Sequence, residues 1–274
     1  MSLPILNITA APTTQTLIRY FHQTQSNWSA HVSQSTTLDI GTACYNPQLS
    51  AVFIANRMLD AALPPEITPA QAIQQADEHF ASHGATSLQW VMNPSAPPPQ
   101  TAPLVEELLA RGFKKYTTDI MYLDKMPATI PAGTKDAIKI IPARASFKHI
   151  RALHEEAVTQ KNKSQLIEAR MNHLDDPHYD ALLALKDGTP VATTGVLAMG
   201  EVGLIAQVYV SENHRNRGIG TTMMGRAMEI CARSLFKHVL LDVVEGNSNG
   251  VRFYEKFGFR RIGQFAYYQI QDRP

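Results

Sequence analysis

The sequence predicts a mixed α/β protein built on a mostly antiparallel sheet with helices flanking it. Short apolar segments bounded by turn residues are typical of strands, and three of them follow one another directly in the second half of the chain. Elsewhere apolar residues recur every three or four positions, which is typical of amphipathic helices. The composition, 44% hydrophobic and 18% charged, is that of a globular protein.

The second half of the chain carries predicted elements in the order β-α-α-β-β-β-α-β-α-β. Hairpin turns are expected at Asp187-Gly188 and Gly200-Glu201, because short loops of this kind join antiparallel strands. A helix is expected from Ile219 to Ser234, where apolar residues recur at helical spacing. The predicted strands are 138–142, 179–186, 190–199, 202–210, 238–244 and 259–269, and the remaining helices are 145–157, 164–173 and 248–256.

The end of the first half repeats the end of the second half. In both, a strand and a helix are followed by a Gly-Phe pair and a final strand, and Gly112-Phe113 aligns with Gly258-Phe259. Two copies of one fold are therefore predicted. The predicted elements of the first half are strands at 51–57, 86–92 and 113–123 and helices at 69–83 and 104–111.

A segment between the halves has the composition of a linker. The stretch 125–137 holds two prolines and one glycine and shows no hydrophobic period. We therefore expect a linker at 127–137, between a first domain at 1–126 and a second domain at 138–274.

Charge and cysteine content exclude several classes of protein. The chain has 25 Lys and Arg against 24 Asp and Glu, so nucleic-acid and membrane partners are not expected. No apolar run approaches the length of a membrane span, and the start lacks the pattern of a secretory signal. Cys44 and Cys231 cannot form a disulfide framework, which is typical of a reducing compartment, and a cytoplasmic protein is expected. A homodimer is left open.

The segment 208–221 has the pattern of an anion-binding turn. It is read as a strand, a short loop and the start of a helix, with Gly218 and Gly220 letting backbone N–H groups converge at the positive end of the helix dipole. Arg215 and Arg217 add positive charge suited to phosphate oxygens. A pyrophosphate is the expected ligand, and an ordinary glycine-rich helix start with solvated arginines is the alternative.

Two common phosphate-binding motifs do not fit this turn. A P-loop requires a lysine after its last glycine, and Gly220 is followed by Thr221 and Thr222. A dinucleotide fingerprint requires a glycine where Met223 stands. ATP hydrolysis and nicotinamide or flavin binding are therefore disfavoured.

The turn resembles the signature of the GNAT acyltransferase superfamily, [Arg/Gln]-x-x-Gly-x-[Gly/Ala], which residues 215–220 satisfy. A second GNAT-like element follows at 247–259, and the resemblance covers 138–269. It implies a tandem GNAT-like fold with a degenerate N-terminal copy. It also implies acetyl-CoA as donor and direct transfer of the acetyl group to an amine, in a small molecule, a protein or a peptide.

The resemblance further implies roles for individual residues. Tyr254 matches the tyrosine that protonates the leaving thiolate in many relatives, although its helical spacing with Val251 and Phe257 also fits a packed aromatic. Asn247 matches a contact to the cofactor arm and fits a helix cap equally well. The implied CoA-binding residues are Val208, Tyr209, Val210, Arg215, Arg217, Gly218, Ile219, Gly220, Thr221 and Asn247.

The general base is where the sequence departs from the family. Some relatives carry a glutamate at the position of Leu204, and a water relay is the expected substitute. Glu201, Gln207, Tyr209 and Asp242 lie nearby in sequence. No metal is expected, because the histidines show no metal-ligand spacing; those considered are His154, His173, His178 and His214.

The first half lacks both parts of the catalytic pattern. Its loop at 63–68 has no glycine or arginine, and Leu108 stands where the repeat alignment places Tyr254. We expect it to be inert and to wall the acceptor cleft. Lys161 and Lys163 are candidates for attracting a carboxylate-bearing acceptor, with a solvated charge cluster as the alternative. A non-catalytic acyl-CoA-binding module is the rival to the enzyme.

Overall fold

The computed structural model describes residues 11–271, whose strands form one eleven-stranded sheet in the order β1-β2-β3-β4-β11-β5-β10-β9-β8-β7-β6. The strands are β1 Gln34–Leu38, β2 Gly41–Tyr45, β3 Arg57–Ala61, β4 Ser87–Met92, β5 Lys114–Leu123, β6 Lys139–Pro142, β7 Tyr179–Lys186, β8 Thr189–Met199, β9 Val202–Val210, β10 His238–Val244 and β11 Phe259–Gln271. The helices are α1 Thr14–Val32, α2 Pro69–Ser82, α3 Pro98–Ala110, α4 Phe147–Ala157, α5 Lys163–Asn172, α6 Ile219–Arg233 and α7 Ser248–Glu255.

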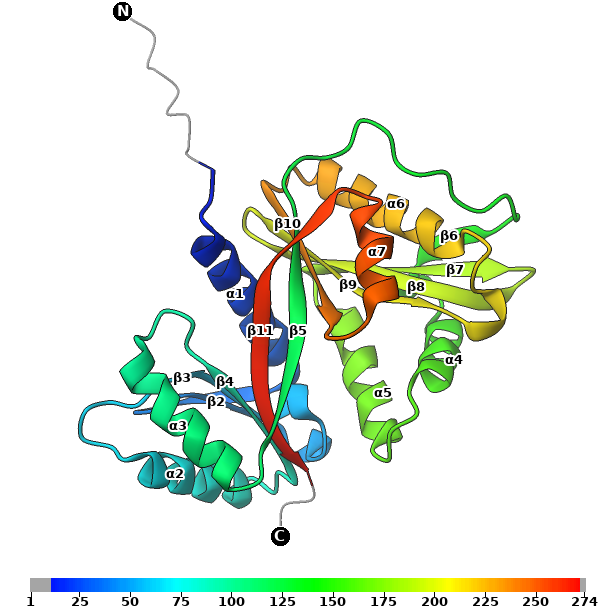
Figure 1. The fold of residues 1–274 in the computed structure, drawn as a ribbon. Coiled ribbons are helices and arrows are strands. Elements are labelled where there is room, and N and C mark those ends of the chain that lie inside the picture. Colours follow the sequence, from blue (N-terminus) through cyan, green and yellow to red (C-terminus); the bar gives the residue numbers. More distant parts are fainter. Residues whose placement is uncertain (1–10, 272–274) are drawn as a thin grey trace, which may run out of the picture.

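The two halves exchange their last strands at the centre of the sheet (Figure 1). β5, from the first half, lies between β10 and β11 of the second, while β11 lies between β4 and β5 of the first. β5 and β11 pair antiparallel from Phe259 opposite Leu123 to Gln269 opposite Lys114. Because Phe113 and Phe259 are equivalent in the repeat, this reciprocal pairing is what two copies of one fold produce when each completes the other's sheet.

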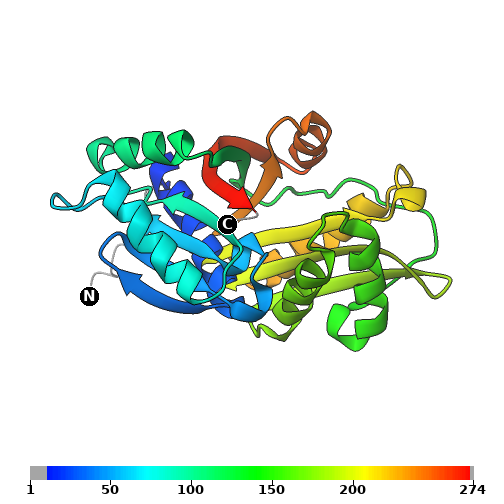
Figure 2. The same cartoon turned by 90° about the horizontal axis from the view of Figure 1, so that it is seen from below.

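Helices cover both faces of the sheet in each half. In the second half α6 packs on one face while α4 and α5 cover the other, as seen edge-on in Figure 1. Figure 2 shows the first-half helices from below, with α2 and α3 together on one side of their strands. One apolar cluster joins the halves, since Phe21 and Trp28 of α1 pack in the same core as Leu153 of α4 and Leu183 of β7.

Most predicted elements are present, and one predicted strand is wrong. Residues 51–57 form turns around a short 3₁₀ helix, Phe53–Ala55, and the strand begins only at Arg57. The side-chain amide of Asn56, fully buried, donates to the carbonyls of Leu49 and Val52 and folds the chain back on itself. The apolar residues before it therefore form a series of tight turns and not an extended strand.

The linker segment has neither helix nor strand between β5 and β6 and runs along α6. Ile130 packs near Gly225 of α6, and the backbone N–H of Thr134 donates to Oγ1 of Thr222 at 2.9 Å. The domain limits 1–126 and 138–274 stay a prediction. Strands from both sides of these limits belong to one hydrogen-bonded sheet, so the limits separate two parts of the sequence but not two sheets.

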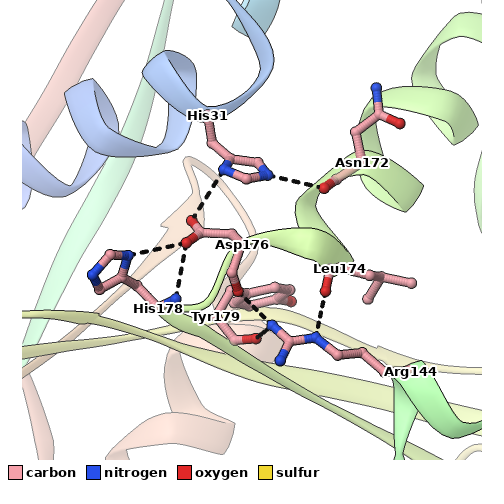
Figure 3. Close-up of polar contacts among 7 residues, drawn as sticks. All are labelled: His31, Arg144, Asn172, Leu174, Asp176, His178 and Tyr179. Carbon is pink, nitrogen blue, oxygen red and sulfur yellow. Dashed lines mark hydrogen bonds and ion pairs between the residues drawn. The ribbon is translucent and has the colours of Figure 1, made fainter.

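A polar network holds α1 against the second half (Figure 3). The carboxylate of Asp176, buried between two histidines, lies 3.8 Å from His31 of α1 and 3.2 Å from His178. His31 also contacts the carbonyl of Asn172 at 3.0 Å. Arg144 donates to the carbonyls around Asp176 and fixes the turn that carries it. These contacts position α1 as a wall of the site described below.

Among residues 11–271, no helix combines the length and apolar character that crossing a bilayer requires. Cys44 and Cys231 are free thiols, and both are buried.

Candidate functional site

The site lies where β9 and β10 separate. Their parallel pairing runs only from Val202 opposite His238 to Leu204 opposite Leu240. Beyond it β9 bulges against β8, and Gln207 takes a left-handed conformation with φ of 57°. A bulge bends its strand and re-aims side chains, so β9 leaves β10 and exposes backbone that would otherwise be paired.

A cavity of about 480 Å³ opens at this separation. Its walls come from both halves of the chain, which agrees with the expectation that the first half walls a cleft. The lining residues used in the argument are Gln25, Trp28 and Ile54 from the first half, Arg170 from α5, Gln207 from β9, Asp242 from β10, Asn247 at the N-cap of α7 and Tyr254 from α7.

Tyr254 lines this cavity from α7, and its ring is packed as well. The ring meets those of Phe253 and Phe259 at centroid distances of 5.2 and 6.3 Å. Burial raises the pKa of the Tyr254 hydroxyl to about 12, and the charge of Asp242 adds to the shift. The hydroxyl is therefore protonated at neutral pH and can donate a proton into the cavity. Both interpretations of Tyr254 apply to different parts of the same side chain.

Asp242 lines the same cavity from β10. Its side chain is exposed to this space, and desolvation by the surrounding protein raises its pKa above the usual value against the opposing charge of Arg57. A carboxylate with a raised pKa in a cleft is suited to proton transfer near neutral pH. Leu204, at the position of the family glutamate, is only 3% exposed and belongs to the core.

In the sequence, Asp242 is only a neighbour of the expected base position. The available signal was one acidic residue inside an otherwise apolar strand, which is unusual without a local reason. What the sequence does not contain is the separation of β9 and β10, which opens Asp242 to the cavity.

The start of α6 has the geometry expected of an anion-binding turn. Gly218 is the N-cap residue, with φ of 78°, and no side chain in the described part of the chain caps this end of the helix. A Cβ on Gly218 would lie 2.8 Å from the backbone nitrogen of Thr134, so both the positive φ and the lack of space favour glycine at this position. The first turn of α6 therefore keeps its N–H groups free of side-chain caps, which suits a phosphate.

The equivalent end of α2 in the first half is closed. Thr68 accepts from the backbone N–H of Gln71, and the Gln71 side chain reaches back to the Thr68 N–H in a capping box. Leu108, the counterpart of Tyr254, is fully buried in the core of that half. The first half therefore has neither an open helix end nor a hydroxyl at the matching positions.

The two arginines of the turn differ in placement. The Arg215 guanidinium donates to the carbonyl of Val210 at 3.1 Å and lies over the ring of Tyr209. It holds the end of β9 against the loop, while Arg217 is exposed on the loop. Glu156 of α4 reinforces this end by accepting from the Tyr209 hydroxyl at 3.1 Å.

The other predicted cofactor residues flank the same turn. The side chain of Ile219 is buried in the core, so only its backbone is available to a ligand. Asn247 caps α7 by accepting from the Gly250 N–H at 2.9 Å, and it also lines the cavity. Val208, Val210, Gly220 and Thr221 are partly exposed between the cavity and the start of α6. Their contacts to a cofactor stay a prediction.

Comparisons with known proteins agree with this architecture. The model of the acetyltransferase (GNAT) family matches residues 147–259. A functionally unknown conserved protein from Staphylococcus epidermidis superposes with a TM-score of 0.64 at 13% identity, covering 88% of this chain and 95% of its own.

Two further solved structures carry the family in their descriptions. A GCN5-related N-acetyltransferase from Kribbella flavida has a TM-score of 0.60 at 16% identity, covering 93% of this chain and 95% of its own. A tandem GNAT protein from the clavulanic acid biosynthesis pathway has a TM-score of 0.50 at 18% identity, covering 74% of this chain and 69% of its own. At these identities the likeness concerns the fold alone.

Proposed function

We propose that the protein is an N-acetyltransferase, because residues 147–259 match the model of the acetyltransferase (GNAT) family. It transfers an acetyl group from acetyl-CoA to the amine of a small molecule, protein or peptide. The observation that carries the proposal is the cavity between β9 and β10, where a protonated Tyr254 and the carboxylate of Asp242 line one space.

The proposed cofactor path follows features of this chain. The uncapped start of α6 at Gly218 suits the pyrophosphate, and the backbone of β9 beyond Leu204, no longer paired with β10, suits the amide-bearing arm. Acetyl-CoA supplies the activated acyl group. This path would end in the cavity beside Tyr254, whose hydroxyl donates the proton that the departing thiolate needs.

Asp242 is the base we propose for the amine. An amine is protonated at neutral pH and must lose a proton before it can attack a carbonyl. Asp242 can attract the ammonium group and accept its proton, and its raised pKa favours the acceptance. This assignment replaces the expected water relay and accounts for a leucine at position 204.

The proposal is tested by replacing Tyr254 with phenylalanine. Release of free thiol from acetyl-CoA in the presence of an amine panel should fall about 100-fold or more, the usual contribution of a general acid. CoA affinity in calorimetry should stay within a fewfold of wild type, with NADH and ATP as ligands that do not bind. The matched control is Tyr116→Phe, because Tyr116 is 41% exposed on β5 and its ring stacks on that of Tyr267, away from the cavity lining.

The same experiment separates the rival. CoA binding without thiol release from any amine would favour the non-catalytic acyl-CoA-binding module. An absence of CoA binding would refute both functions. Full turnover by Tyr254→Phe would remove the proposed acid and leave the reaction itself in place.

A further inference from the structure

The cavity has a positively charged wall that the proposed chemistry does not use. Arg170, near the end of α5, lines it together with Asp242 of β10. No described carboxylate pairs with Arg170, and the groups that raise its pKa are the hydroxyls of Tyr179 and Tyr209. The guanidinium is thus a half-buried cation that lines the cavity and is not paired with Asp242 or any other described carboxylate.

Burial makes such a cation costly. It lowers the pKa of Arg170, since removing a charge from water is unfavourable unless an opposite charge is supplied. His154 on α4 cannot compensate this charge, since an imidazole is either neutral or positive. Burial first and then the charges of Arg170 and Arg151 lower its pKa to about 4, so it is neutral. An anionic ligand in the cavity would supply the missing charge.

Arg57 is not available to bind an anion in the cavity. Arg57 is only 8% exposed, its guanidinium donates to the hydroxyl of Ser29 at 3.1 Å, and its charge lowers the pKa of Asp242. It does not line the cavity, whereas Arg170 does. Lys161 and Lys163, singled out in the sequence, are exposed at the start of α5 and do not line it either.

We propose that the acceptor is an amino acid or a similar zwitterion whose carboxylate binds Arg170 while its amine faces Asp242. This inference rests on the proposed function, because it assigns the substrate class of the same site. One guanidinium with no second cation on its wall matches a monoanion, and a planar fork of donors fits a carboxylate in two parallel hydrogen bonds.

The first half supplies the surroundings for the acceptor's side chain. Trp28 of α1 and Ile54 line the cavity and present apolar surface. The Trp28 ring is held in place, since it stacks on His173 at 3.8 Å and meets the edge of Tyr179 at 4.8 Å. An apolar side chain on the acceptor would therefore pack on a preformed surface.

The test measures binding, so it does not depend on turnover. The probes are N-acetyl-glycine, N-acetyl-methionine and N-acetyl-phenylalanine, each compared with its own amide by calorimetry on CoA-loaded and free full-length protein. The acetylated nitrogen carries no charge, so the two members of each pair differ only in the carboxylate. The variants are Arg170→Met, which removes the charge, and Arg170→Lys, which keeps it without the fork.

At least one carboxylate should bind wild type about 10- to 100-fold more tightly than its amide, the range expected for charge-assisted hydrogen bonds. Arg170→Met should abolish the difference, and Arg170→Lys should retain part of it. The matched control is Arg151→Met, because Arg151 lies outside the cavity in an exposed pair with Glu168 at 3.2 Å, and it should keep the difference.

Equal binding of carboxylate and amide, no binding of any carboxylate, or an unchanged preference in Arg170→Met would each overturn the inference. A failure of the proposed function gives a different result, namely no thiol release from acetyl-CoA with any amine. Urea unfolding of each variant separates loss of the site from loss of the fold, and Arg170→Lys keeps the inference testable if Arg170→Met does not fold.

Discussion

Replacing His173 with phenylalanine should make the stability of the protein less sensitive to acid. His173 is 2% exposed and stacked between Trp28 and His31, and among residues 11–271 neither of its ring nitrogens has a hydrogen-bond partner. Burial, together with the charges of His31 and Arg57, lowers its pKa from 6.5 to about 3. The native protein therefore holds this ring neutral under conditions in which the unfolded chain protonates it.

The sign and size of the effect follow from that difference. Because the native pKa is lowered, the unfolded state binds more protons between about pH 3 and 6.5, and stability falls as the pH is lowered through this window. At pH 5 the unfolded chain gains about 2 kcal/mol from protonating one such histidine, at about 1.4 kcal/mol per pH unit. Above pH 6.5 this contribution vanishes.

The assay is urea unfolding at pH 7 and pH 5 for wild type and His173→Phe. The loss of unfolding free energy between the two pH values should be about 2 kcal/mol smaller in the variant. Any cost of fitting the larger ring enters at both pH values and cancels. The control is His149→Phe, at a partly exposed histidine near the start of α4, which should retain the wild-type loss. Equal losses in wild type and His173→Phe would refute the reasoning.

Three other changes test the architecture and the site. Gly218→Ala should weaken CoA binding in calorimetry at least tenfold, because its φ of 78° and the close contact with Thr134 both disfavour a Cβ. The control is Gly188→Ala, at a φ of 79° with open space around it, which should leave CoA binding unchanged. A fragment of residues 138–274 should aggregate or oligomerise in size-exclusion chromatography because β10 and β11 lose β5, and a soluble monomer would contradict the exchange. Asp242→Asn should lower kcat/KM about 100-fold and remove the acid limb of its pH profile. In wild type the midpoint of this limb should lie above the usual pKa range of aspartate, because the pKa of Asp242 is raised. An unchanged profile in the variant would exclude Asp242 as the base.

Local patterns in the sequence predicted most helices and strands of the second half. Strands 179–186, 202–210 and 238–244 were predicted at the limits that the structure shows, because alternating or apolar runs between turn residues are read within a few positions. The glycine-rich start of α6 was predicted for the same reason, since a strand-to-helix connection is a local feature. The strand predicted at 51–57 failed because one buried amide, Asn56, outweighed the apolar pattern.

The sequence by itself determined the repeat, the family resemblance, the glycines at the start of α6 and Tyr254, since each depends on neighbours in the chain. Only the tertiary structure decided that β5 and β11 exchange between the halves, and that Asp242 and Arg170 face one cavity. Strand order and side-chain convergence are set by contacts between segments far apart in sequence. The hydrophobic period of a strand records which face is buried and does not record which strand lies beside it.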